Sequence, residues 1–372
     1  MPKSIEELLE MQIKEDAADL HINVGLPPVL RMHGGLTKVG TEPVTPEIAS
    51  NYMKAITSRD HQEELQKVGG TDFGFAFKDL ARFRVSIFKE RGNTAMALRL
   101  IPYEFLSFEQ IGLNQKTMEH LLTRPRGLIM VVGPTGSGKT TTLASMVDWM
   151  NANLQRHIIT IEDPIEYYHS HKKSIITQRE LGVDVPTFSE ALRRGLRQDP
   201  DIFLVGEMRD LDTIEAAITA AETGHIVFAT LHTTGASRTV DRIVNVFSVA
   251  QQEQIRVMLS VSILGIISQV LLNRIDKKGK VAAFELMLAT TSIQNLIRER
   301  KTYRIISEIQ TGGKMGMVTM DSFLVNLFKE GKIALDDVLT YAYDPISTQA
   351  ELVAQGLIDE AVTIKKEDMA KR

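Results

Sequence analysis

Between residues 126 and 231, short apolar segments alternate with longer segments of helix-forming residues. The apolar segments are too short for helices and are rich in β-branched residues, which is typical of buried strands; they are residues 128–132, 157–161, 202–205 and 226–231. A helix is expected over residues 211–222, before Gly224, and another after the capping residues Thr187 and Glu190. Strands that alternate with helices predict an α/β fold with a mostly parallel sheet that is covered on both faces.

The first hundred residues follow a different pattern. A short helix is predicted behind the capping box of Ser4 and Glu7, and residues 46–67 also have helical spacing. Other segments, above all residues 71–100, alternate apolar and polar side chains between turn residues and therefore predict antiparallel strands. We expect a small α+β domain here.

The C-terminal part is predicted to be largely helical from Gly235 onward. One helix is expected to end at Gly331 and to bury a single face, formed by Met320, Phe323, Leu324, Leu327 and Phe328. The predicted divisions are an N-terminal domain, a linker, an α/β core, a helical C-terminal region and a charged tail, at residues 1–100, 101–120, 121–290, 291–360 and 361–372.

A glycine-rich turn follows the first predicted strand of the core. The segment GPTGSGKTT matches the pattern G-x-x-x-x-G-K-[ST], with Gly133 and Gly138 as its fixed glycines, and a helical segment follows. Glycines let backbone N–H groups converge on phosphate oxygens, while Lys139 reaches the β and γ phosphates and the Thr140 hydroxyl ligates magnesium. A chance glycine turn before a helix is the alternative, but the complete motif between a strand and a helix predicts binding of a nucleoside triphosphate.

Composition narrows the possible partners. The chain has 372 residues, of which 43 are basic and 47 acidic, so it lacks the positive charge typical of proteins that bind nucleic acid, and no such partner is expected. It has no cysteine, which excludes disulfides and thiolate zinc sites. The charged N-terminus and the brevity of the longest apolar run, residues 260–272, favour a cytoplasmic location.

Acidic side chains follow two of the predicted strands, at the sheet edge where α/β proteins bind ligands. Glu207 is expected to hold magnesium or its water. Glu162, Asp163 or Glu166 could orient the attacking water, although exposed carboxylates at strand ends are common. Two such strand ends beside a phosphate loop favour a functional interpretation.

For other candidate residues, spacing alone gives weaker evidence of a functional role. A lone histidine at a strand end, such as His232, usually only forms hydrogen bonds, and no metal-site spacing supports zinc binding by it. Arg82 and Arg84 alternate with apolar residues along a predicted strand, which is typical of solvated charge on its exposed face.

Four motifs in order resemble the secretion ATPase superfamily of type II secretion, type IV secretion and type IV pili; they are GPTGSGKTT, TIEDPIEYYH, DPDIFLVGEMRD and AETGHIVFATLHTT. From AADLHI at Ala17 to QTGGKMGMVTMD at Asp321, the chain is similar to the PilT family of twitching-motility retraction ATPases. The resemblance implies a PAS-like α+β domain followed by a RecA-like P-loop ATPase domain with a helical C-terminal part.

The resemblance also implies roles for individual residues. In the aspartate box TIEDPIE, Glu166 is the implied catalytic base or water-orienting group, and Glu207 belongs to the Walker B motif. His232, with His225, matches the histidine box, which senses nucleotide across the ring. The Walker A loop comprises Gly133, Thr135, Gly136, Ser137, Gly138, Lys139, Thr140 and Thr141.

In the family, the arginines that Arg82 and Arg84 match reach into a neighbouring subunit's nucleotide site. The resemblance therefore favours a functional role over the solvated charge that the spacing alone indicates. The retraction signature AIRNLIRE occurs here with Ser292 and Gln294 in place of alanine and arginine. Extension ATPases of the PilB type typically carry a four-cysteine zinc module, which a chain without cysteine cannot form.

These features predict a homohexameric ATPase that uses ATP and Mg²⁺ to retract type IV pili. Hydrolysis is expected to change the angle between the two domains, so that pilins are withdrawn into the inner membrane. The expected location is cytoplasmic, at the inner-membrane base of the pilus, in contact with its platform protein. A PilU-type accessory retraction ATPase, a RecA-like nucleic-acid translocase and a nucleotide-binding scaffold without hydrolysis are the alternatives.

Overall fold

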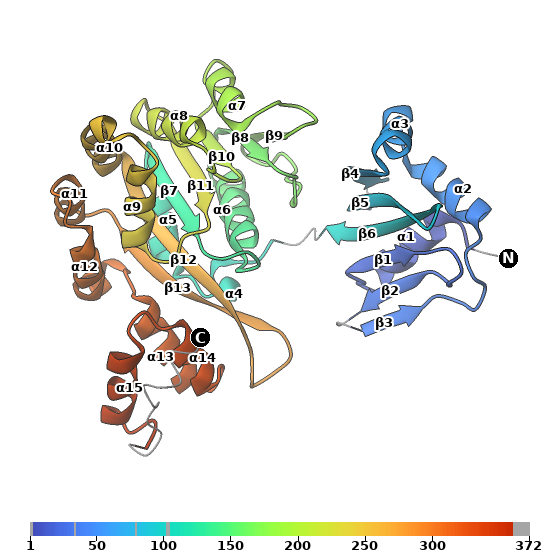
Figure 1. The fold of residues 1–372 in the computed structure, drawn as a ribbon. Coiled ribbons are helices and arrows are strands. Elements are labelled where there is room, and N and C mark those ends of the chain that lie inside the picture. The colour runs from blue at the N-terminus through green and yellow to red at the C-terminus, as the bar shows by residue number, and fades with distance from the viewer. Residues whose placement is uncertain (1–2, 33–34, 79, 102–104, 360–372) are drawn as a thin grey trace. The chain divides into compact units, whose positions relative to one another are not determined.

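The computed structural model describes residues 3–32, 35–78, 80–101 and 105–359 (Figure 1). The chain divides into two compact units, the first formed by Met1–Glu104 with Pro164–Tyr168 and the second by Phe105–Asp163 with His169–Arg372. The predicted linker, residues 101–120, includes some residues that the structure does not describe, and its remaining part overlaps two helices of the second unit. The predicted charged tail lies outside the described residues.

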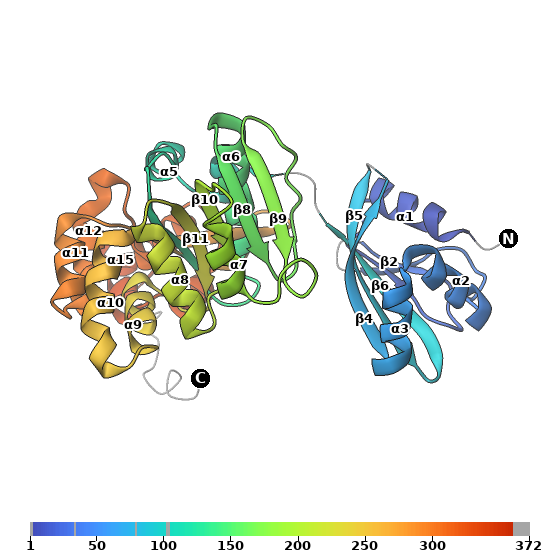
Figure 2. The same ribbon diagram turned by 90° about the horizontal axis from the view of Figure 1, so that it is seen from above.

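The first unit is built on a six-stranded antiparallel sheet, in the order β3-β2-β1-β6-β5-β4. Its strands are β1 (Asp19–Ile22), β2 (Val29–Met32), β3 (Gly35–Lys38), β4 (Gly70–Phe77), β5 (Ala81–Glu90) and β6 (Asn93–Ile101). Helices α1 (Ile5–Lys14), α2 (Pro46–Ile56) and α3 (Arg59–Val68) all pack on one face of this sheet (Figure 2). The capping box of Ser4 and Glu7 and the antiparallel strands are confirmed.

The second unit contains a seven-stranded sheet, in the order β13-β12-β7-β11-β10-β8-β9, which is parallel except for β13. Its strands are β7 (Gly127–Val132), β8 (His157–Glu162), β9 (Ile175–Glu180), β10 (Ile202–Val205), β11 (Ile226–Leu231), β12 (Ile263–Asn273) and β13 (Lys280–Leu288). The four strands predicted from apolar segments are present, and the α/β fold is confirmed.

Helices cover both faces of this sheet (Figure 1). One face is covered by α4 (Phe108–Ile111), α5 (Gln115–Leu122) and α6 (Lys139–Asn153). The other is covered by α7 (Phe188–Gly195), α8 (Leu211–Glu222), α9 (Ala236–Asn245), α10 (Val249–Ser262), α11 (Thr291–Arg298) and α12 (Ile305–Thr311). Two short 3₁₀ helices, η1 (Thr302–Arg304) and η2 (Gly312–Met315), flank α12.

The C-terminal helices form a separate small core with the ends of β12 and β13. They are α13 (Met320–Lys329), α14 (Leu335–Tyr341) and α15 (Pro345–Ala354). The predicted apolar face of α13 lies in or against this core, and the helix ends just before Gly331. No helix among the described residues has the length and apolarity needed to cross a bilayer.

The prediction of a largely helical chain from Gly235 is wrong for β12 and β13. The apolar run at residues 263–272 is buried on both faces of the sheet, so its sequence shows no alternation of apolar and polar positions. A continuous apolar run does not distinguish a buried strand from a buried helix segment. β9 was not predicted either, because four of its six residues are only half-buried.

Two cross-strand partners, Ser268 on β12 and Glu285 on β13, hold the N-terminus of α9. The N–H of Gly235 donates to Ser268 Oγ at 3.0 Å, and the N–H of Ala236 donates to Glu285 Oε1 at 2.7 Å. Ser268 Oγ also lies 3.2 Å from the hydroxyl of Tyr343, which precedes α15. These bonds fix the chain that follows His232 and connect it with the C-terminal helices.

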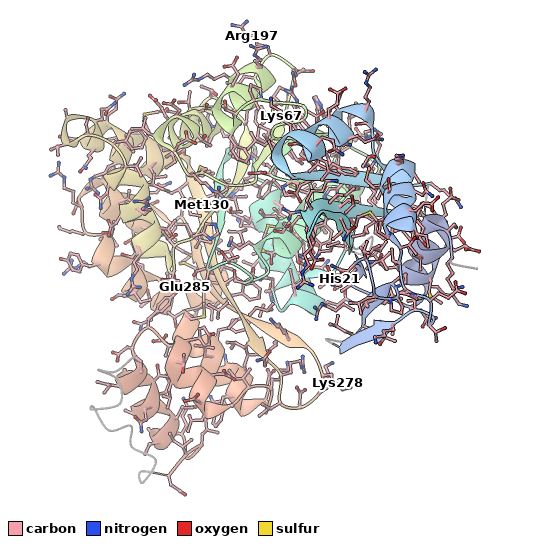
Figure 3. The ribbon with its side chains drawn as sticks, turned by 45° about the vertical axis from the view of Figure 1, so that its right-hand side comes forward. His21, Lys67, Met130, Arg197, Lys278 and Glu285 are labelled. Carbon is pink, nitrogen blue, oxygen red and sulfur yellow. The ribbon has the colours of Figure 1, made fainter. Side chains whose placement is uncertain are left out.

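Figure 3 labels Glu285, which lies on β13. It is 1% exposed, and its Oε2 has no hydrogen-bond partner among the described residues. Burial raises the pKa of Glu285 to about 7, and nearby Asp321 acts in the same direction, while the hydrogen bond from Ala236 and the charge of Arg238 oppose the shift. The folded protein therefore binds this proton more tightly than the unfolded chain does.

We expect Glu285→Gln to change the pH dependence of stability. Because the folded-state pKa is raised, the contribution of Glu285 to stability is fully present below its ordinary pKa of 4.5 and is lost as the pH rises through about 7. Between pH 5 and 8, the free energy of unfolding of the parent should therefore fall by about 2.5 kcal/mol relative to that of the glutamine variant, at about 1.4 kcal/mol for each pKa unit. Thermal unfolding across this pH range measures the difference. The exposed Glu253→Gln is the control, and equal pH profiles for the two variants would contradict the assignment.

Candidate nucleotide-binding site

The glycine-rich turn joins the end of β7 to the start of α6. Its last residue, Gly138, is the N-cap of α6 and has a φ of 86°, a left-handed conformation that favours glycine. No side chain caps this helix, so the N–H groups of its first turn are available to an anion. All eight predicted Walker A residues lie in this turn or in the first turn of α6.

Lys139 lies across the turn. Its ammonium group donates to the carbonyl oxygen of Gly133 at 2.8 Å and to that of Pro134 at 3.0 Å. A positive charge therefore lies beside the N-terminus of α6, and both features favour the binding of a phosphate.

A chain of polar contacts joins this turn to the end of β10. Thr135 Oγ1 lies 3.5 Å from His232 Nδ1, and His232 Nε2 lies 3.0 Å from Glu207 Oε1. We assign the proton to Nε2, because Glu207 accepts there and the threonine hydroxyl can donate to Nδ1. The fold thus brings together three predicted residues from three separate motifs.

Arg209 completes this chain and was not singled out from the sequence, although it lies in the quoted motif DPDIFLVGEMRD. Its guanidinium group lies 2.8 Å from Glu207 Oε2. Burial would raise the pKa of Glu207, but the hydrogen bonds from Arg209 and His232 and the charge of Arg209 outweigh burial and lower the pKa. Glu207 is therefore a carboxylate at neutral pH.

The three acids of the aspartate box have different surroundings. Glu162 is buried, and its Oε1 accepts hydrogen bonds from Thr160 at 2.6 Å and from Gln178 at 3.2 Å. Asp163 and Glu166 are exposed. The side chain of Glu162 is thus held within the strand end, while the other two remain candidates to orient water.

The remaining predicted residues, Glu166, Arg82 and Arg84, belong to the first unit. The guanidinium of Arg82 stacks on the ring of Tyr168, 3.5 Å from its centroid, in the segment that carries Glu166. Arg84 is exposed and forms no ion pair within the part of the chain that the structure describes.

Arg84 starts a row of charged residues across the sheet of the first unit. Arg84 is the cross-strand partner of Arg99, which pairs with Asp19, which pairs in turn with Arg31. Asp19 lies 2.8 Å from Arg99 and 3.6 Å from Arg31. Three arginines with one aspartate leave this row positively charged, on the face of the sheet opposite the helices.

His225 is not part of the site. It precedes β11, whereas His232 follows it, so the two lie about 23 Å apart at roughly 3.3 Å for each residue of the strand. The Nδ1 of His225 lies 3.0 Å from the carbonyl oxygen of Ala220.

A cavity of about 610 Å³ opens beside the glycine turn in the second unit. It is lined by the start of α6, the neighbouring ends of β12 and β13, and residues of α4 and α13. Its size is within the usual range for small-molecule sites.

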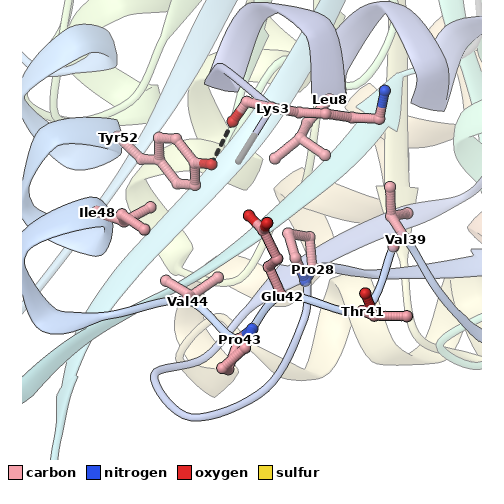
Figure 4. Close-up of a pocket in the computed structure, with 11 residues that line it drawn as sticks. Lys3, Leu8, Pro28, Val39, Thr41, Glu42, Pro43, Val44, Ile48 and Tyr52 are labelled. Carbon is pink, nitrogen blue, oxygen red and sulfur yellow. Dashed lines mark hydrogen bonds between the residues drawn. The ribbon is translucent and has the colours of Figure 1, made fainter. Parts of the chain in front are cut away.

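The first unit has a smaller cavity, of about 250 Å³, between α1, α2 and the loop before α2 (Figure 4). Its walls are mainly apolar, and the hydroxyl of Tyr52 at its edge donates to the carbonyl oxygen of Lys3. None of the predicted site residues lines it.

Comparison with known proteins identifies the family to which this chain belongs. Residues 1–327 match the family model described as type II/IV secretion system protein. The type IV pilus retraction ATPase PilT of Pseudomonas aeruginosa is 45% identical over 92% of this chain and 98% of its own length. A twitching motility protein of Neisseria gonorrhoeae is 46% identical over 82% of each chain, and the P. aeruginosa pilus ATPase PilU is 35% identical over 91% of this chain and 88% of its own.

A solved structure shows the same fold. The crystal structure of the pilus retraction motor PilT with bound ADP superposes with a TM-score of 0.87 at 44% identity, covering 94% of this chain and 99% of that one.

Proposed function

This chain belongs to the type II/IV secretion ATPase family and to its PilT-type retraction ATPases, and we propose that it hydrolyses Mg-ATP in a ring to withdraw type IV pili. The contact chain from Thr135 through His232 to Glu207 carries the proposal, because it joins the phosphate-binding turn to the acid of the Walker B motif. The greater identity to PilT than to PilU favours the retraction motor over its accessory form.

The substitutions in the retraction signature lie mainly outside the protein core. Ser292 is exposed and Gln294 is half-buried on α11, whereas Ile293 and Ile297 of the same helix are fully buried. The two differences therefore change the surface of the signature helix and leave its buried face unchanged.

In the proposed complex, the N–H groups of the turn and Lys139 hold the phosphates. The nucleoside extends toward β12 and β13, into the cavity beside Thr141, because Glu207 and His232 lie on the other side of β7. ADP in the related retraction motor supports nucleotide binding at this site.

The residues present also suit magnesium. Thr140 offers a hydroxyl oxygen and Glu207 a carboxylate, which are the hard oxygen donors that Mg²⁺ prefers, and the described residues contain no cluster of three or more metal-ligating side chains. Few protein ligands are typical of Mg²⁺ sites that are completed by phosphates and water. The ion would neutralise charge on the phosphates, and Glu207 would hold it or its water.

The arginine row of the first unit is proposed to act on a neighbouring copy of the chain. Arg84 is exposed, and a free guanidinium can stabilise the charge of phosphoryl transfer when a neighbour supplies it. Such head-to-tail use of different surfaces produces a ring when the rotation between neighbours closes, and we propose that this ring is a homohexamer. The ring would act in the cytoplasm at the inner-membrane base of the pilus, through its platform protein.

Glu166→Gln should lower the steady-state rate of phosphate release by roughly 10² to 10⁴, the usual contribution of a general base. The amide has the same size but cannot accept a proton. Asp163→Asn, an exposed acid of the same box, is the matched control and should retain most of the activity. A reversed result would assign the base to Asp163, and parental turnover in Glu166→Gln would contradict its role.

Arg84→Ala should lower turnover by roughly 10³-fold while leaving ADP binding intact, as for other arginines supplied in trans. Arg59→Ala, at another exposed arginine of the first unit, is the control for surface charge.

Mixing Arg84→Ala with Lys139→Ala, each inactive alone, distinguishes action in trans from action in cis. In randomly mixed rings, about a quarter of the interfaces combine an intact phosphate turn with an intact arginine, so activity should return to that extent. No recovery would contradict the proposed trans contact.

A further inference from the structure

Strand β12 lies beside the phosphate-binding turn. It runs parallel to β7, and the last register pair between them joins Ser268 to Val132. Gln269 therefore lies next to Gly133, where β7 ends and the turn begins. Gln269 is 2% exposed, and along the sequence it is distant from every motif assigned to the nucleotide.

The amide of Gln269 connects the turn to the first turn of α6. Its Nε2 donates to the carbonyl oxygen of Ser137 at 2.6 Å, and its Oε1 accepts from the hydroxyl of Thr142 at 2.7 Å. The orientation of the amide is determined, because a backbone carbonyl can only accept a hydrogen bond. Both bonds are buried, so each polar group would lose its partner if the amide were removed.

Both fixed glycines of the motif also lie against Gln269. A Cβ on Gly133 would lie 2.2 Å from the backbone oxygen of Gln269, and a Cβ on Gly138 would lie 2.8 Å from its Nε2. The first distance would require displacement of the backbone, and the second would require movement of the Gln269 amide. The glycines thus allow β12 to approach the turn, in addition to allowing its backbone conformation.

The bond to Ser137 also determines where a phosphate-binding group points. In a planar trans peptide, the carbonyl oxygen and the following N–H point in opposite directions. Because Gln269 holds the oxygen of Ser137 toward β12, the N–H of Gly138 points away from β12. We propose that Gln269 is a positioning residue that directs the Gly138 N–H toward the β-phosphate of the nucleotide, an inference that rests on the nucleotide site proposed above.

The test compares three variants of the full chain in their affinity for fluorescent mant-ADP with Mg²⁺. Gln269→Met removes both hydrogen bonds at similar length, Gln269→Glu keeps an acceptor for Thr142 but loses the amide donor at neutral pH, and Thr142→Val removes only the second bond. We expect mant-ADP to bind about tenfold more weakly to both Gln269 variants, and Thr142→Val to stay within about threefold of the parent. An equal loss in Thr142→Val would overturn the proposal, because the bond to Ser137 would then not be the important one.

Competition with AMP distinguishes positioning from a general structural role. AMP lacks the β-phosphate, so its affinity should change less than about twofold in the Gln269 variants. Equal weakening of ADP and AMP would show that Gln269 merely supports the pocket. Thermal unfolding of each nucleotide-free variant identifies a fold defect, and if Gln269→Met does not fold, Gln269→Glu supplies the measurement. Absence of mant-ADP binding to the parent would instead contradict the proposed function.

Discussion

Binding of phosphate by backbone N–H groups requires a loop whose peptides cannot turn away from the ligand. The structure meets this requirement at the centre of a sheet, since β7 lies between β12 and β11. Gln269 of β12 holds the turn from one side, and His232 at the end of β11 contacts Thr135 from the other. Neighbouring strands thus supply both the rigidity of the turn and its connection to the Walker B acid.

The groups proposed for hydrolysis are divided between the two compact units. The phosphate turn, Glu207 and His232 belong to the second unit, whereas Arg82, Arg84 and Glu166 belong to the first. In the proposed ring, a nucleotide that requires groups from both units would bias the arrangement of the subunits, because each state of the phosphates presents a different charge to those groups. We propose this division as the physical basis for motor activity.

Much of the fold could be predicted because local pattern and tertiary structure agree. The bounds of β10, β11 and α8 follow directly from apolar segments and their flanking glycines. By contrast, β12 has no periodicity, since both of its faces are buried. The motif predicted the phosphate turn, but the sequence could not show that Glu162 is held by Gln178 or that Ser137 meets Gln269, because these contacts join residues distant along the chain.

The side chains of adjacent residues of β12 point to opposite faces of the sheet, as in any strand. Ser268 accepts a hydrogen bond from the N–H of Gly235 before α9, and Gln269 donates one to the carbonyl oxygen of Ser137 in the turn before α6. A one-residue shift of the register of this strand would turn both side chains to the opposite faces of the sheet and abolish both contacts at once. A substitution within β12 leaves the register of both contacts intact, whereas a change in its length before Ser268 shifts that register.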